Sequence, residues 1–214
     1  MSTKKTSQPK PNERTYSGIS LSERVAKRRE CFVQAGIELF GTIGYNATTM
    51  RRLVSASGLT NRYFYESFES MEDLLIACYE SLMTGFRDRL QQVLLNAKEQ
   101  SQINVKDGLL CFFEAMQDPK FAKITHSEVL GISTKVDATY NRKSADFAVL
   151  LMSYLEENEA IVIDPAEKQI IGAALVGAVT HAAMVWVKSH YQQPIDVVVE
   201  AARKIFEGTL REMT

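Results

Sequence analysis

The hydrophobic residues of this chain recur every three to four positions over most of its length, which is the spacing of amphipathic helices. No segment has the strict apolar and polar alternation of a half-buried strand, and the β-branched run at residues 197–199 falls within a helical pattern. The pattern therefore predicts an all-α fold of about nine helices. These helices are expected at about residues 22–43, 49–56, 61–67, 70–98, 105–116, 119–130, 134–157, 165–191 and 195–213.

The two short helices at residues 49–56 and 61–67 are separated by a break centred on Gly58. Gly58 suits the positive φ that a sharp turn between helices often needs, and Thr60 is a good N-cap for the second helix. Two helices joined by a turn of three or four residues form a helix-turn-helix unit, whose second helix enters the major groove of DNA. This segment therefore indicates DNA binding.

The second short helix carries side chains that suit contacts with phosphates and base edges. These residues are Thr60, Asn61, Arg62, Tyr63 and Tyr65. Arg and Asn side chains recognise guanine and adenine through paired hydrogen bonds. Phe64 and Phe68 lie four residues apart, so they share one face and can anchor the helix to a core. The alternative is an ordinary surface helix with aromatic anchors, and these residues alone leave it open.

The distribution of charge favours DNA binding, although the net charge of −1 does not. Residues 1–66 contain 11 Lys and Arg and 5 acidic residues, so this part carries +6 and the rest of the chain carries −7. A basic head on an acidic body is expected when one end of a protein meets phosphate. Residues 1–20 are rich in Lys, Ser, Thr and Pro and are expected to be a flexible tail, either merely solvated or reaching phosphates as an arm.

The order and spacing of residues between Arg24 and Leu75 are more specific than a helix-turn-helix alone. The pattern is a basic amphipathic helix ending in Leu39-Phe40 and Gly44-Tyr45, then Thr48-Thr49, Gly58-Leu59-Thr60, Tyr65, Phe68 and Met71-Glu72-Asp73-Leu74-Leu75. It resembles the TetR family of bacterial transcriptional regulators. The remaining two thirds of the chain match that family only in helical character and length. The resemblance implies a helix-turn-helix domain at residues 21–68 and a ligand-binding and dimerisation domain at residues 69–214.

The full set of predicted DNA contacts adds five residues to those of the second short helix. They are Arg28, Thr48, Thr49, Arg51 and Met71. Three positions depart from the family pattern, which often has a small residue at position 62, His at 67 and Lys at 71. Because that Lys usually meets a phosphate, Met71 is expected to weaken sequence-independent binding slightly, and Arg62 to offset the loss. These departures leave the operator sequence unpredicted.

Residues 170–187 form a run of eighteen residues without a charge. A transmembrane helix is one interpretation, but the run is shorter than the roughly twenty residues that a bilayer needs and has Lys close to both ends. We expect instead a helix that packs on its own core with one face and on a partner subunit with the other. The resemblance implies that helices 165–191 and 195–213 form a four-helix bundle with their copies in a homodimer.

The middle helices combine large apolar residues with a few polar ones, a composition found both in ligand pockets and in plain cores. The residues predicted to line a pocket are Phe112, Phe113, Met116, Phe121, His126, Tyr140, Phe147, Met152 and His181. Core packing is the alternative for each of them. The resemblance implies a small, often hydrophobic effector that changes the spacing of the two heads. We therefore expect a ligand-responsive repressor that binds a palindromic operator as a dimer.

Other classes of protein find little support. The sequence has no Gly-rich phosphate loop, no Gly-x-Ser-x-Gly elbow and no metal-ligand spacing, so we expect no enzyme, cofactor or metal. Cys31, Cys78 and Cys111 are far apart, which favours buried thiols in the cytoplasm over a disulfide framework or a redox sensor. No signal peptide is predicted. A helical sensor without specific DNA binding and a membrane-attached helical protein remain as alternatives.

Overall fold

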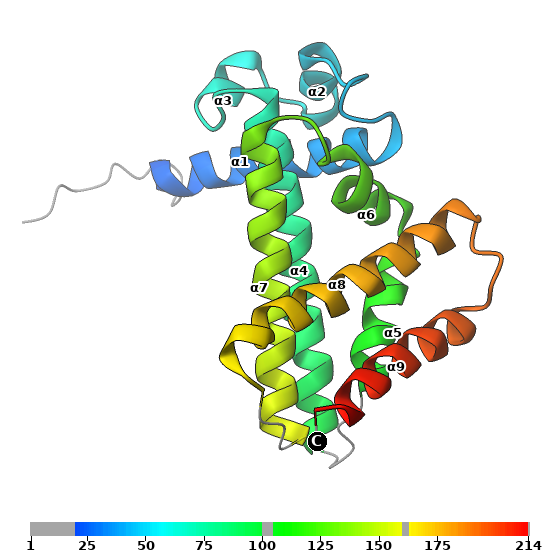
Figure 1. Cartoon of the computed structure of the whole chain (residues 1–214). Coiled ribbons are helices and arrows are strands. Elements are labelled where there is room, and N and C mark those ends of the chain that lie inside the picture. Colours follow the sequence, from blue (N-terminus) through cyan, green and yellow to red (C-terminus); the bar gives the residue numbers. More distant parts are fainter. Residues whose placement is uncertain (1–19, 100–104, 160–162, 214) are drawn as a thin grey trace, which may run out of the picture.

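The computed structural model describes residues 20–99, 105–159 and 163–213, and every regular element in these ranges is helical. The first four helices are α1 (Leu21–Thr42), α2 (Met50–Ser57), α3 (Asn61–Tyr65) and α4 (Met71–Glu99). They are followed by α5 (Val105–Met116), α6 (Pro119–Lys123), a π-helical turn (Ile124–Glu128), α7 (Thr134–Glu159), α8 (Pro165–Lys188) and α9 (Ile195–Arg211) (Figure 1). The all-α prediction is confirmed. The predicted tail lies outside the described residues, apart from Ser20.

Local signals in the sequence set the ends of several helices. The Ser20 hydroxyl accepts a hydrogen bond from the backbone N–H of Glu23 at 3.1 Å, and the Glu23 carboxylate accepts one from the Ser20 N–H at 2.7 Å. This capping box begins α1. Gly58 ends α2 with φ of 67°, a left-handed conformation that costs glycine little. Asp118 and Asp164 cap α6 and α8, and a proline follows each of them.

The head, defined here as α1, α2, α3 and the first turns of α4, has its own hydrophobic core. Its fully buried side chains include Phe32, Phe40, Leu53, Phe64, Leu74 and Leu75. Ile124 and Val129, from the π-helical turn and the residue after it, belong to the same cluster. The head core therefore extends beyond residues 21–68, because α4 and the π-helical turn each contribute side chains to it.

The body, defined here as the rest of α4 together with α5 to α9, surrounds a second core. Phe113, Met152, Leu155, Trp186 and Phe206 are buried in it. Helix α4 has 29 residues and is therefore about 40 Å long, so it reaches from the head through the body. It runs alongside α7, while α5 packs against α9 (Figure 1). One continuous helix thus belongs to both cores.

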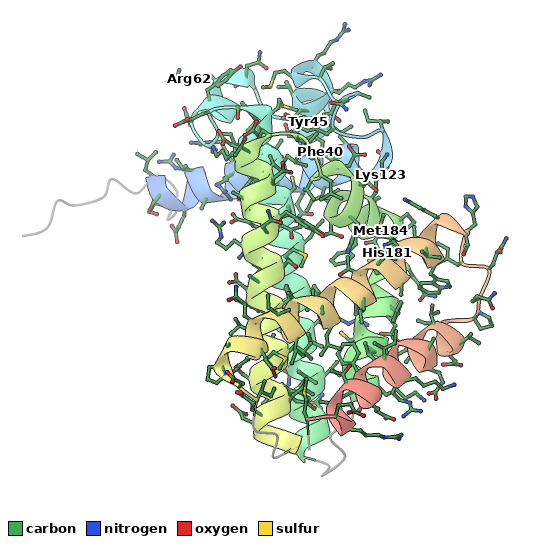
Figure 2. The ribbon with its side chains drawn as sticks, viewed as in Figure 1. Phe40, Tyr45, Arg62, Lys123, His181 and Met184 are labelled. Carbon is green, nitrogen blue, oxygen red and sulfur yellow. The ribbon has the colours of Figure 1, made fainter. Side chains whose placement is uncertain are left out.

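A second connection between head and body lies where the end of α1 packs against α6. A Cβ atom on Gly41 would lie 2.9 Å from the Cα of Lys120, so only glycine permits this separation of the two backbones. The Lys120 ammonium forms an ion pair with Glu38, and the Lys123 ammonium donates a hydrogen bond to the Thr42 carbonyl at 2.7 Å. Figure 2 shows Lys123 on the side of α6 that faces the head. The joint is therefore polar as well as tightly packed.

The single helix expected at residues 119–130 is instead a short α-helix followed by the π-helical turn. In this stretch the Thr125 hydroxyl donates a hydrogen bond to the Phe121 carbonyl at 2.7 Å. Such hydroxyl bonds compete with the regular backbone ladder of a helix, and π-helical turns occur frequently at functional sites. The periodicity of the sequence gives no sign of this widened turn.

Helix α8 is the one described helix that is long and apolar enough to cross a membrane, judged by length and composition alone. Its apolar window has a mean hydropathy of 1.9, and 22% of that window is buried inside the chain. Leu175, Val179, Ala183 and Trp186 form the buried face. The opposite face is exposed, so α8 carries more apolar residues than the core of a single chain buries.

Candidate nucleic-acid interface and effector cavity

Helix α3 is held on the head by aromatic side chains. The Phe64 and Phe68 rings lie 5.5 and 6.5 Å from the Phe32 ring of α1, both edge to face. A helix of five residues is not stable alone, so this packing is what fixes its position. Truncating one such buried Phe to Ala typically costs about 3–5 kcal/mol. The packing leaves the other side of α3 in solvent.

The outward side of α3 carries most of the predicted recognition residues. Thr60 and Asn61 are exposed, the Arg62 side chain is 87% exposed, and Tyr65 is 64% exposed. Figure 2 shows Arg62 on the outside of the head, on the side away from the body. The Thr60 hydroxyl makes no capping hydrogen bond, although its backbone occupies the N-cap position. These groups form a polar surface of suitable chemistry for DNA, and their contacts with DNA remain predictions.

Arg28 differs from these outward residues because it binds α3 from α1. Its guanidinium forms an ion pair with Glu66 at 2.9 Å and lies over the Tyr63 ring, 4.4 Å from the ring centroid. The stacking leaves Tyr63 half-buried. Glu66 also lies 3.6 Å from the Arg62 guanidinium. Arg28 therefore fixes the orientation of α3 on α1.

Helix α2 supplies further polar groups next to α3. The Thr49 hydroxyl accepts a hydrogen bond from the Arg52 backbone N–H at 3.4 Å, and Arg51 is exposed. Thr48, in contrast, is only 8% exposed, and its hydroxyl donates to the Gly44 carbonyl at 2.7 Å. The Thr48 hydroxyl therefore stabilises the turn before α2, and its contact with DNA stays a prediction.

Met71 also has a role in packing. It begins α4, is half-buried and packs against the head core. A thioether carries no charge for a phosphate, and the position is partly covered by apolar neighbours. The structure thus gives Met71 a place in the head core and shows no surface group there that suits a phosphate.

The body contains a cavity of about 160 Å³ between α4, α5, α7 and α8. Five of the nine predicted pocket residues line it, namely Phe112, Phe121, His126, Tyr140 and Phe147. Helix α4 contributes Tyr79, Met83, Phe86, Leu90 and Leu94. The sequence did not predict this, because the apolar stripe of a helix looks the same whether it faces a cavity or a core. Thr125, Ser144 and Thr180 are further lining residues that the sequence did not single out.

The other four predicted pocket residues do not line the cavity. Phe113 and Met116 are fully buried, and the Phe113 ring packs edge to face on Trp186 at 5.8 Å. Met152 is buried where α7 packs against α8, and a Cβ atom built on Gly172 of α8 would lie 2.8 Å from the Met152 Cγ. His181 is exposed on the outer face of α8 (Figure 2). Each of these side chains points to a different side of its helix from the cavity.

His126 is a buried polar group of the cavity wall, next to the buried Thr125. It is 8% exposed, and burial lowers its pKa to about 4, so the imidazole is neutral at pH 7. Its Nδ1 lies 2.6 Å from the Thr125 hydroxyl, and the Phe112 ring lies edge to face at 6.2 Å. The cavity therefore combines an aromatic wall with one neutral hydrogen-bonding base.

The cysteines have no reactive surroundings that the structure reveals. Cys78 and Cys111 are buried, and burial raises the pKa of both thiols, which disfavours the reactive thiolate. The Cys78 thiol donates to the Val33 carbonyl, with Sγ 3.4 Å from the oxygen. Within the described residues, no group of three or more His, Cys, Asp or Glu side chains is placed to hold a metal ion.

Comparison with known proteins identifies the head. A family model described as bacterial regulatory proteins, tetR family, matches residues 32–78, which run from α1 through the helix-turn-helix into α4. The head of this chain is that of a TetR-family regulator. The match covers α2 and α3, so Arg62 and Tyr65 lie in the segment that the family model describes, and their contacts with DNA stay predictions.

Solved structures extend the similarity from the head to the body. The chain is similar to the fatty acid degradation regulator FadR from Bacillus halodurans, with a TM-score of 0.70 and 18% identity over 86% of this chain and 96% of that one. For FadR from Bacillus subtilis in complex with stearoyl-CoA, the TM-score is 0.66 and the identity 16%, over 81% of this chain and 97% of that one. For E. coli NemR in its reduced form, the TM-score is 0.63 and the identity 20%, over 83% of this chain and 96% of that one. At these identities the likeness establishes a shared fold.

Proposed function

We propose that this TetR-family chain is a homodimeric repressor that binds a palindromic operator through α3 and releases it when a small apolar effector fills the cavity. Tyr79 carries the proposal, because it lines the cavity and is also a buried member of the head core. A ligand that displaces Tyr79 therefore disturbs the packing that holds the recognition helix. Tyr140 of α7 lines the same cavity and also packs against the head core.

The exposed faces of α8 and α9 support the homodimer. On α8 the exposed residues include Ile170, Ala173, Gly177, His181 and Val185, and on α9 they include Val197, Ala201, Ile205 and Gly208. Both series recur at helical spacing, so each helix presents one apolar or small-residue face to solvent. A second copy of the chain would cover these faces. It would also supply the second head needed for two half-sites about 34 Å apart.

The proposed dimer also accounts for the hydropathy of α8 without a membrane. One face of this helix packs on the core and the other would pack on the partner, so a charge-free sequence is expected on both sides. The proposal places the protein in the cytoplasm with its operator DNA and assigns it no catalytic activity.

An apolar effector fits both the cavity and the relatives. The Bacillus subtilis regulator FadR was solved in complex with stearoyl-CoA, so a TetR-like body can accommodate a ligand with a long apolar part. The effector here must bind the DNA-incompetent state more tightly, typically by about 1–3 kcal/mol. The cavity of about 160 Å³ lies below the roughly 300–1,000 Å³ of typical ligand pockets, so it suits a small molecule or opens on binding.

The decisive experiment is a binding titration of the purified protein with duplex fragments from beside its own gene, across a series of salt concentrations. The proposal expects tight, sequence-selective binding of a dimer, with affinity that falls steeply as salt rises because counterions are released. Binding as a monomer, or equal affinity for every fragment, would refute it. A folded dimer that binds no fragment, even after removal of copurified small molecules, would leave only a sensor without DNA binding.

A further inference from the structure

Two short contacts around Thr125 determine which nitrogen of His126 carries the proton. The Thr125 Oγ1 lies 2.7 Å from the Phe121 carbonyl oxygen and 2.6 Å from His126 Nδ1. A hydroxyl has one hydrogen, and a carbonyl oxygen can only accept. Both contacts are satisfied together when the hydroxyl donates to Phe121 and Nδ1–H of His126 donates to the hydroxyl. The neutral ring then carries its proton on Nδ1.

This tautomer leaves Nε2 of His126 as an acceptor without a partner. The residue is 92% buried and lies on the cavity wall, and no described residue donates a hydrogen bond to Nε2. Nε2 is not one of the fully buried polar atoms that lack a partner, so it keeps accessible surface and can accept a hydrogen bond from water or a ligand. The depressed pKa of His126 fits this arrangement, because the ring stays neutral and Nε2 keeps its lone pair.

The rest of the wall restricts the charge and shape of an occupant. None of the described residues that line the cavity is Asp, Glu, Lys or Arg. A buried ion would find no counter-charge there, so a charged ligand is strongly disfavoured. Eight lining side chains are Phe or Tyr, including Phe86, Phe112 and Phe147 around the same space. A cavity of about 150 Å³ lined by apolar side chains holds one benzene ring, so about 160 Å³ suits a single-ring compound.

We propose that the effector is an uncharged molecule with a compact aromatic or apolar body and a hydroxyl or N–H group that donates a hydrogen bond to Nε2 of His126. This inference rests on the proposed function, since it names the class of ligand for the same cavity. Phenols and neutral aromatic alcohols or amides fit the class. Carboxylates do not, and neither do ethers or hydrocarbons of the same size.

A matched set of single-ring probes tests this directly. The probes are p-cresol, which has a donor; 4-methylanisole and toluene, which have none; and 4-methylbenzoate, which is charged. Calorimetric titration of the full-length wild-type protein is expected to show p-cresol bound about 10-fold or more tightly than either donor-free probe, with no binding of 4-methylbenzoate. Toluene is the more hydrophobic compound, so a preference for p-cresol cannot come from hydrophobicity.

Two variants and one spectrum complete the test. His126→Leu is expected to reverse the preference so that toluene binds at least as well as p-cresol. His190→Asn, at an exposed histidine outside both the cavity and the proposed dimer face, is expected to keep the wild-type preference. Because His126→Leu can fail to fold, ¹⁵N NMR of the wild-type imidazole provides an independent measurement. Nε2 is expected to be unprotonated in the free protein, and its resonance should shift on addition of p-cresol but not of toluene.

The outcomes separate this inference from the proposed function. Equal binding of p-cresol and toluene, a protonated Nε2, or no binding of p-cresol would each overturn the donor requirement, whatever happens to DNA. Selective binding of p-cresol that leaves operator affinity unchanged would instead uphold the requirement and count against the effector-driven release of DNA.

Discussion

The carboxylate of Glu128 accepts a hydrogen bond from the backbone N–H of Tyr45 at 2.6 Å, across 83 positions of the sequence. The Glu128 side chain is only 16% exposed, and the Lys123 ammonium lies 3.9 Å from it. Glu128 ends the π-helical turn two residues after His126, and Tyr45 lies in the segment that leads into α2. This hydrogen bond therefore joins the cavity wall to the helix-turn-helix.

Replacing Glu128 by Ala should weaken this joint. The Tyr45 N–H loses a charged acceptor, so we expect the free energy of unfolding to fall by about 1–3 kcal/mol in a denaturant titration. We also expect the variant to bind operator DNA but to respond less to any effector, because the cavity wall no longer holds the segment before α2. Operator affinity measured with and without p-cresol gives the size of the effector response.

Two variants serve as controls for Glu128→Ala. Glu128→Gln keeps a neutral acceptor and should recover part of the lost stability. Glu114→Ala removes a partly exposed ion pair with Arg89 in the body and should change stability by less than about 1 kcal/mol. If Glu128→Ala responded to the effector as strongly as the wild type, this hydrogen bond would play no part in the coupling between the cavity and operator binding.

Arg62→Ala should impair reading of the operator without unfolding the protein. The side chain is 87% exposed, so its loss leaves no cavity, whereas one lost base contact costs about 1–3 kcal/mol, or about 5- to 150-fold in affinity. Tyr65→Ala, at the other exposed side chain of α3, is expected to act in the same direction. Titration of labelled operator duplex against random duplex measures the specific part.

Arg87→Ala is the matched control for Arg62→Ala. Arg87 is exposed on α4 in the body and has only a weak contact with Asp88 at 3.6 Å. Its removal should leave operator affinity unchanged. Wild-type affinity and selectivity in Arg62→Ala and in Tyr65→Ala would refute the assignment of α3 as the recognition helix.

Gly177→Gln tests the proposed dimer. Nothing lies within 4 Å of a Cβ built on Gly177, so the substitution fits the single chain and should stabilise the helix by up to about 1 kcal/mol. In the proposed bundle the same side chain would meet the partner helix. We therefore expect a folded monomer by sedimentation equilibrium, with weakened operator binding.

Gly85→Gln provides the comparison. Gly85 is an exposed helical glycine of α4 that also has open space around it, but it lies outside the proposed interface. This variant should remain dimeric and bind the operator normally. If Gly177→Gln dimerised as tightly as Gly85→Gln, the outer face of α8 would not be the interface.

His126 should make the fold sensitive to acid. Its pKa is about 4 in the folded chain and about 6.5 when unfolded, so below pH 6.5 protons bind preferentially to the unfolded state. The free energy of unfolding is therefore unaffected by His126 above pH 6.5, and it falls by up to about 3 kcal/mol as the pH is lowered towards 4. Urea titrations between pH 7 and 4 should show that His126→Gln loses less stability over this range than the wild type.

His190→Asn is the control for the acid effect. His190 is exposed after α8 and lies outside the proposed dimer face, so this variant should follow the wild-type pH profile. Carboxylates with lowered pKa, such as Asp73, contribute their own losses in acid, and these are common to all three proteins. The difference between the profiles therefore isolates His126, and parallel profiles for His126→Gln and wild type would show that the imidazole is not desolvated.

Much of the fold follows from signals within a few residues of each other. The capping box of Ser20 and Glu23, the left-handed Gly58 and the caps at Asp118 and Asp164 each depend only on neighbouring groups. The helix-turn-helix was predictable for the same reason. Its anchors and its outward residues are set by helical spacing over a short segment.

The sequence by itself therefore determined most of the helices, several of their ends, the helix-turn-helix and the basic head, because local backbone chemistry and periodicity decide these features. Only the tertiary structure decided which side chains surround the cavity. Phe112 lines it while the adjacent Phe113 is core, and His126 faces it while His181 is exposed, although the residue types are identical. Burial depends on which distant helix packs against each face, and no local pattern encodes that packing.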